Sequence, residues 1–169
     1  MKRKIEITIL LIVSILIINV DGTYAKTSKN LVRNPGFESS DFSMWKYKGT
    51  GMDKLDYYTE DPVGIWDKED DCHSGDYTFH FWSTYKHHFR LEQTISKKKL
   101  NKKKTYKASV YIQGDEVGKN AEIYLYVIAD GKKYVSGLVE LDGWQDWKKV
   151  TIDNIKCTKG DVKIGVYVD

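Results

Sequence analysis

Apolar and polar residues alternate one by one along much of the chain, a pattern typical of β-strands with one buried face. The alternation is clearest in residues 88–95, 106–113, 122–129 and 162–168, where every second side chain except Gln93 is aliphatic or aromatic. Beyond residue 25, no stretch shows the 3.6-residue periodicity of an amphipathic helix. The pattern therefore predicts an all-β protein.

Turn-forming residues separate the alternating stretches at Gly114-Asp115, Asp130-Gly131, Asp142-Gly143 and Lys159-Gly160-Asp161. Many short strands, each with one apolar face, predict an antiparallel β-sandwich around a single core. The stretch from residue 49 to 75 is less regular. There we expect a long loop with one strand at about residues 55–58.

The first 25 residues have the features of an export signal. Lys2, Arg3 and Lys4 precede an apolar run of 14 residues from position 7 to 20, and Thr23-Tyr24-Ala25 offers a cleavage site after Ala25. A membrane anchor would need about 20 apolar residues. We therefore expect residues 1–25 to be a secretory signal peptide and residues 26–169 to be one extracellular domain, with no membrane association after cleavage.

The start of the predicted mature chain, residues 30–38, combines an apolar extended beginning with the turn sequence Asn34-Pro35-Gly36 and the pair Phe37-Glu38. This arrangement predicts the first strand and the first corner of the domain.

Charge is abundant but nearly balanced, with 27 basic and 24 acidic residues. This balance argues against a dedicated nucleic-acid binder. The basic residues gather in residues 97–104, between two predicted strands. The run is interpreted as a solvated turn, and attraction to anionic cell-wall polymers is the alternative. Cys72 and Cys157 could form a disulfide in an oxidising compartment, but two cysteines leave that pairing open.

If the aliphatic side chains point inward, the two-residue period directs their neighbours to the outer face. Flat aromatic rings can stack on the C–H faces of sugars, and amide or guanidinium groups can hydrogen-bond sugar hydroxyls. An exposed cluster of such residues is typical of a contact surface. The pattern predicts a single carbohydrate-binding surface formed by His80, Trp82, Arg90, Tyr111, Gln113, Tyr124, Tyr126 and Tyr167.

Several segments resemble galactan-binding carbohydrate-binding modules of family sixty-one, which accompany secreted bacterial endo-β-1,4-galactanases. The matching segments span most of the predicted mature chain: residues 30–38, 43–46, 73–77, 80–83, 111–114, 120–126 and 142–148. The resemblance implies a jelly-roll, galactose-binding-like β-sandwich that binds a plant cell-wall β-galactan. It also implies that the module is, or was, linked to a catalytic domain in a longer parent enzyme.

Two further expectations follow from the resemblance. Such modules continue past a strand like residues 165–168 into a closing strand, so a chain that stops at Asp169 would lack that strand and leave a sheet edge unpaired. They also hold a structural calcium ion near the first corner. Glu38 matches the usual ligand and Asp76 could assist it, because calcium prefers oxygen ligands in loops.

The residues do not indicate an enzyme. Glycoside hydrolysis needs two carboxylates about 5–9.5 Å apart across a cleft, and the catalytic (β/α) barrel needs about 250 residues. No phosphate-binding loop, catalytic triad or zinc-binding spacing is present in the sequence. We therefore expect a polysaccharide-binding module without catalytic activity. The alternative is a secreted adhesion domain that binds protein or an anionic wall polymer.

Overall fold

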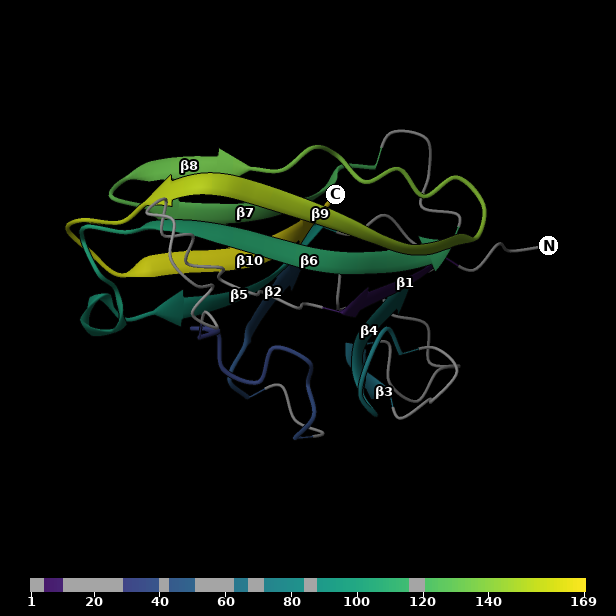
Figure 1. The fold of residues 1–169 in the computed structure, drawn as a ribbon. Helices are drawn as coiled ribbons and strands as arrows, with labels where there is room; N and C mark the ends of the chain where they lie inside the picture. The colour runs from purple at the N-terminus through teal and green to yellow at the C-terminus, as the bar shows by residue number, and fades with distance from the viewer. Residues whose placement is uncertain are drawn as a thin grey trace, which may run out of the picture.

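The computed structural model of the chain describes residues 5–10, 29–39, 43–50, 63–66, 72–83, 88–115 and 121–169. In this part of the chain ten strands form two antiparallel sheets of five strands each, and the sheets pack as two layers (Figure 1). The 3-10 helix η3 at Lys97–Lys99 is short, and no helix in the described part is long and apolar enough to cross a membrane. The prediction of an antiparallel β-sandwich is confirmed.

One layer, sheet B, contains three of the strands that the alternation predicts. In spatial order its strands are β2 (Lys46–Thr50), β5 (His88–Ile95), β10 (Val162–Val168), β7 (Ile123–Ala129) and β8 (Lys132–Val135). The register places Val166 between Leu91 of β5 and Leu125 of β7. Since all three side chains are fully buried, the apolar positions of this sheet line up on its inner face.

The second layer, sheet A, contains the longest strands. In spatial order its strands are β3 (Val63–Trp66), β4 (Thr78–Ser83), β1 (Ile5–Leu10), β6 (Thr105–Asp115) and β9 (Gln145–Lys156). Phe79 and Phe81 of β4 and Ile112 of β6 are buried. These inner positions alternate with the outward ones, as the sequence pattern predicts.

Aromatic rings join the two layers at one side of the core. Phe81 of β4 lies 4.3 Å from Phe89 of β5, measured between ring centroids. Phe37 contacts Phe79 at 5.6 Å and Trp45 at 5.7 Å. Burial of a large aromatic side chain stabilises the folded state by about 1.5–3 kcal/mol, so these contacts help to fix the two sheets together.

Residues 30–38 do not form the strand that we predicted there. They form an irregular segment with turns, in which Asn34 and Phe37 have positive φ angles of 44° and 61°. The buried amide of Gln93 explains why. It accepts a hydrogen bond from the Arg33 N–H at 2.8 Å and donates one to the Arg33 carbonyl at 3.0 Å. These two bonds satisfy backbone groups that a strand would pair with a neighbouring strand.

Four strands were not predicted as separate elements: β1, which the sequence assigns to the export signal, and β2, β3 and β8. β3 lies within the stretch that we expected to be mostly loop, and β8 follows the Asp130-Gly131 turn with three of its four residues exposed. Neither is long enough to show a clear alternation. The strand predicted at about residues 55–58 lies outside the described residues.

β1 lies in the part of the chain that the sequence assigns to an export signal. It pairs antiparallel with β4 on one side and with β6 on the other. The predicted absence of a closing strand would leave a sheet edge unpaired. Within the described residues β1 lies between β4 and β6 and pairs with both, so neither strand has an unpaired edge on the side that faces β1. The division into residues 1–25 and 26–169 stays a prediction.

Removal of residues 1–25 should therefore weaken sheet A. We expect the free energy of unfolding to fall by about 3 kcal/mol or more, because β4 and β6 both lose backbone hydrogen bonds that contribute about 0.5–1.5 kcal/mol each. The measurement is urea unfolding of the whole chain, produced without export, beside a chain that begins at residue 26. A chain lacking only residues 1–4 is the control. Equal stability of all three would show that β1 does not support the sheet.

Candidate functional site

The outer face of sheet B carries a row of polar and aromatic residues that crosses four strands. The register aligns Lys48 of β2 with Arg90 of β5, Arg90 with Tyr167 of β10, and Tyr167 with Tyr124 of β7. Their neighbours along each strand point into the core, so the pleat directs these four side chains outward. Sheet pairing thus brings together residues that are far apart in the sequence.

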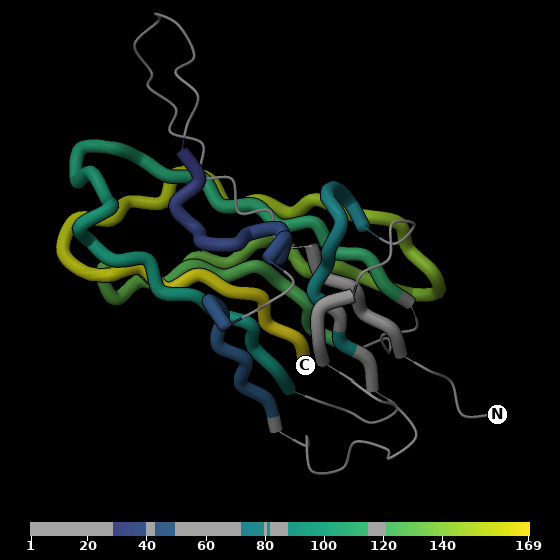
Figure 2. The backbone as a smooth tube through the Cα atoms, turned by 90° about the horizontal axis from the view of Figure 1, so that it is seen from below, coloured from purple at the N-terminus to yellow at the C-terminus, as the bar shows by residue number. Residues whose placement is uncertain are grey.

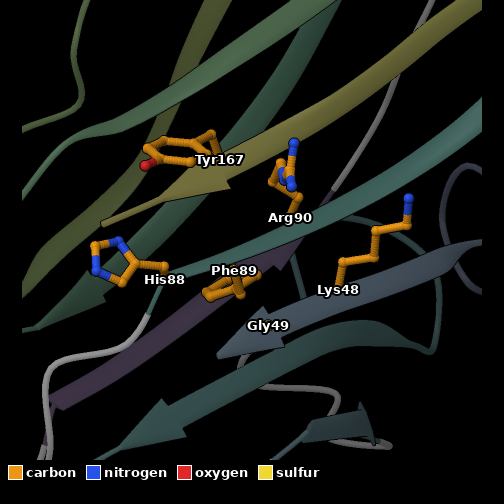
Figure 3. A pocket seen from close by; sticks show the side chains of 6 residues that line it. All are labelled: Lys48, Gly49, His88, Phe89, Arg90 and Tyr167. Carbon is orange, nitrogen blue, oxygen red and sulfur yellow. The ribbon is translucent and has the colours of Figure 1, made fainter. Parts of the chain in front are cut away.

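A shallow groove of about 340 Å³ lies on this face, above β5 and between β2 and β10. It is lined by Lys48, Gly49, His88, Phe89, Arg90 and Tyr167. Figure 3 shows Lys48, Arg90, His88 and Tyr167 around this opening. The Phe89 side chain is buried in the core, so the strand backbone forms the floor. The groove combines one aromatic ring with three nitrogen-bearing side chains.

Asp169 fixes the position of two groove residues. His88 Nδ1 lies 2.8 Å from Asp169 Oδ1, and the Tyr167 hydroxyl donates to Asp169 Oδ2 at 3.2 Å. Burial, followed by the nearby Asp169 carboxylate, raises the pKa of the Tyr167 hydroxyl. The hydrogen bond to Asp169 orients the Tyr167 ring at the edge of the groove.

Tyr124 and Tyr167 stack on each other, with ring centroids 4.9 Å apart and an interplanar angle of 27°. The Lys133 ammonium donates to the Tyr124 hydroxyl at 3.0 Å and lies 4.8 Å from the centre of that ring. Each ring of a stacked pair keeps only one face for another contact. Tyr167 lines the groove, whereas Tyr124 supports Tyr167 from the other side.

Tyr126 lies on the same outer side but is 2 % exposed, so the prediction that it presents a free ring is wrong. Its register partner on β10 is Gly165, and a Cβ atom there would lie 2.9 Å from the Tyr126 hydroxyl. Because glycine has no side chain, the ring extends across β10 towards β5. There its hydroxyl donates to Glu92 Oε2 at 2.8 Å.

Glu92 is a buried carboxylate on this outer side of sheet B, 4 % exposed. Lys48 Nζ lies 3.3 Å and Lys163 Nζ 3.5 Å from its Oε1 atom. Burial alone would raise the pKa of Glu92, but the Tyr126 hydroxyl and the two ammonium groups outweigh burial and hold this pKa below its usual range. The carboxylate therefore anchors Tyr126 and Lys48 beside the groove.

The other predicted binding residues belong to the opposite sheet. Tyr111 and Gln113 lie on β6, and His80 and Trp82 lie on β4, all in sheet A. The prediction of one common surface is therefore wrong, because the outer faces of the two sheets point away from each other. Only Arg90, Tyr124, Tyr126 and Tyr167 share sheet B.

The sheet A residues have less accessible surroundings than we predicted. Gln113 is 3 % exposed. Tyr111 is half-buried, and the His73 ring lies 3.7 Å from it between centroids. Trp147 contacts His73 at 5.7 Å. The side chains of His80 and Trp82 lie outside the described residues. The binding roles of these four residues stay a prediction.

Glu38 and Asp76, the predicted calcium ligands, lie close together at the first corner. Glu38 Oε2 accepts a hydrogen bond from the Asp76 N–H at 3.0 Å, and Glu38 packs against Gly75, whose φ is +76°. One carboxylate oxygen is thus used to hold the turn. In the part of the chain that the structure describes, no group of three or more metal-ligating side chains is present. These residues alone do not complete a calcium site, and the metal stays a prediction.

Sequence reasoning missed two groove residues, Lys48 and His88. β2 shows no apolar alternation that would mark it as a strand, and His88 was interpreted only as a surface residue of its strand. Trp144, left unassigned by the sequence, is 52 % exposed after the Gly143 turn.

Within the described residues, no disulfide joins Cys72 to Cys157, and burial raises the pKa of the Cys157 thiol to about 11.

Comparison with known proteins gives one informative match. No model of a known protein family matches the chain, and no curated protein matches it. Among solved structures, the chain is similar to TmCBM61, which was determined in complex with β-1,4-galactotriose. The two share 30% sequence identity over 83% of this chain and 88% of the other, with a TM-score of 0.66.

The buried carboxylate should make stability depend on pH. Because the folded-state pKa of Glu92 is below its usual value, its stabilising effect is complete above pH of about 4.3 and is lost as the pH falls through the folded-state pKa. We expect Glu92→Gln to lower the free energy of unfolding by about 1.5–3 kcal/mol at neutral pH. The difference should shrink as the pH falls from about 4 through the folded-state pKa, since only below that pKa is the carboxylate neutral in both states.

The measurement is urea unfolding of both proteins across this pH range. Glu140→Gln removes an exposed carboxylate and serves as the control, with an expected change within about 0.5 kcal/mol. A constant difference between the wild type and Glu92→Gln at every pH would contradict the assigned role of the charge.

Proposed function

Because this chain belongs to carbohydrate-binding module family 61, we propose that it binds β-1,4-linked galactan and does not hydrolyse it. Membership of this family supports carbohydrate binding in general. The observation that carries the proposal of galactan as the ligand is the groove on sheet B, where Tyr167 lies beside Arg90, His88 and Lys48. A similar protein, TmCBM61, was crystallised with β-1,4-galactotriose, which supports a galactose-based ligand.

The groove is suited to an uncharged ligand rich in hydroxyl groups. The Tyr167 ring offers an apolar face to the C–H groups of a sugar ring. The Arg90 guanidinium has five N–H donors, and within the described residues no hydrogen bond occupies them. Lys48 on β2 and His88 on β5 add further donors along the groove. Stacking would fix the plane of one sugar, and the donors would select its hydroxyl positions.

The groove lacks the groups that cleavage would require. Retaining and inverting glycoside hydrolases use a pair of carboxylates across the scissile bond. The residues that line the groove include neither Asp nor Glu. Within the described residues, the two nearby carboxylates are engaged by other groups: Glu92 by Tyr126 and Lys48, and Asp169 by His88 and Tyr167. This supports binding without catalysis at this site.

We also propose where the module acts and to which kind of domain it is linked. Export directed by residues 1–25 would place it outside the cell, where plant cell-wall galactan occurs. A linked endo-β-1,4-galactanase catalytic domain would then be held near its substrate, which raises the effective concentration of that substrate. N-terminal sequencing of the exported protein tests the first part: a mature chain that begins at Lys26, and therefore lacks β1, is expected, and an intact N-terminus would reject cleavage.

Calorimetry with β-1,4-galactan and galactotriose tests the ligand and the position of the site. We expect Tyr167→Ala to weaken binding at least about tenfold, equal to about 1.4 kcal/mol, because the stacking ring is lost. Arg90→Gln should weaken it to a similar extent through lost donors. Xylan and cellulose are the comparison polymers, and equal or absent binding to all of them would reject galactan as the ligand.

Tyr111→Ala is the matched control, since it removes the same ring from the outer side of sheet A. Its affinity should stay within about twofold of the wild type. If Tyr111→Ala abolished binding while Tyr167→Ala kept it, the galactan site would lie on sheet A. Thermal melts followed by circular dichroism establish that each variant is folded.

A further inference from the structure

Three turns that are far apart in the sequence meet at one end of the sandwich. They connect β5 to β6, β7 to β8, and β9 to β10, and they lie at the same end in both views (Figures 1 and 2). The register agrees, because Ile95 pairs with Val162 and Thr105 pairs with Lys156. The β5–β6 turn contains six lysines and the β9–β10 turn contains Lys159, while Lys132 and Lys156 flank the turns at the ends of β8 and β9.

Nine lysines lie in or beside these turns, and eight of them are exposed while Lys104 is half-buried. We call this surface the lysine end. Its lysines are Lys97, Lys98, Lys99, Lys102, Lys103, Lys104, Lys132, Lys156 and Lys159. Six come from the run in residues 97–104, which forms η3 and a following hydrogen-bonded turn.

Two aspartates bind the turns to each other. Asp130, in the β7–β8 turn, accepts hydrogen bonds from the N–H and hydroxyl of Thr158 at 2.7 Å each, and from the Lys159 N–H at 2.8 Å. Asp161, in the β9–β10 turn, accepts one from the Lys97 N–H at 2.8 Å. Both carboxylates thus bond to neighbouring turns, mostly to backbone N–H groups, and they hold the lysine end together.

Because these carboxylates face hydrogen-bond donors of the turns, they leave the ammonium groups without ion pairs. In the described residues none of the nine lysines forms an ion pair with a carboxylate. Nine lysines against two aspartates give this end a charge of +7, whereas the whole chain has +3. The remaining residues therefore carry −4. The lysine end is thus strongly basic although the composition of the whole chain is nearly balanced.

We propose that the lysine end is a second binding site, which takes an acidic polysaccharide of the polyuronate class. Crowded ammonium groups repel one another, and a chain with one carboxylate per sugar would neutralise several of them together. The turns hold the lysines on a broad exposed surface, so a long polymer can contact many of them at once. The choice of a polysaccharide rests on the proposed function of the module.

The chemistry of this end favours a polyuronate over a nucleic acid. Proteins that bind single-stranded nucleic acids combine basic residues with exposed aromatic rings on which the bases stack. Arginine supplies the two-pronged contacts typical of phosphate and base recognition. The three turns contain neither arginine nor tryptophan. The nearby Tyr106 is buried, and the Tyr134 ring has Lys132 Nζ 4.6 Å from its centre. A surface whose only ligand-binding groups are lysine ammonium groups suits a polymer that carries carboxylates at regular intervals along its chain.

The test compares binding of the whole chain to polygalacturonate, to neutral β-1,4-galactan and to single-stranded DNA at 50 and 200 mM salt. The triple variant Lys98→Gln, Lys99→Gln, Lys102→Gln should bind polygalacturonate at least tenfold more weakly at low salt and keep its affinity for galactan. The logarithm of affinity should also depend less steeply on the logarithm of salt concentration, since fewer counterions are released.

A variant with the same change in net charge is the control: Lys29→Gln, Lys46→Gln, Lys148→Gln. These lysines are also exposed but lie outside the lysine end, so polygalacturonate affinity should change less than threefold. Equal losses in both triple variants, or no binding of the wild type to polygalacturonate at 50 mM salt, would overturn the proposal. Tighter binding to DNA than to polygalacturonate would reject the polyuronate as the partner. Loss of galactan binding alone would count only against the groove.

Discussion

One apolar layer between two sheets determines which side chains can form a surface together. Phe89 of β5 contacts Phe81 of β4 across this layer, and each strand directs every second residue into it. The remaining residues face outward, on one of two opposite faces. Since packed sheets are about 10 Å apart, a ligand on sheet B cannot also contact the outer face of sheet A. A binding site on the face of a sheet must therefore be assembled within that sheet, from residues that strand register brings into a row.

Within sheet B, the absence of one side chain organises the outer face. Gly165 leaves room for Tyr126 to cross β10 and reach Glu92, and Glu92 in turn holds Lys48 beside the groove. A side chain at position 165 would clash with the Tyr126 hydroxyl. The buried carboxylate, the phenol and two ammonium groups satisfy one another, as buried polar groups must. The groove is thus bordered by a fixed network, which lowers the entropy cost of ordering Lys48 upon binding.

The sequence predicted the features that depend on near neighbours and missed those that depend on distant ones. The two-residue period of β5, β7 and β10 is local, so their inward and outward positions followed from the pattern. Sheet membership is not local: nothing in residues 106–113 indicates that Tyr111 lies in a different layer from Tyr124. The burial of Tyr126 depends on Gly165, which is 39 positions away. Likewise, the Gln93 side chain hydrogen-bonds to the backbone of Arg33, 60 positions away, in place of the strand pairing that we expected for residues 30–38.

The groove and the lysine end would act over different distances. Contact between a tyrosine ring and a sugar requires the two surfaces to touch, and salt has little effect on it. Attraction between ammonium groups and a polyanion extends over about 8 Å at physiological ionic strength. In a matrix that contains neutral and acidic polysaccharides, the lysine end would act first and hold the module near the matrix. The groove would then select among neutral chains by shape. Separation of the two tasks is compatible with a nearly balanced chain, because the charge of +7 at the lysine end is offset by a net −4 over all remaining residues.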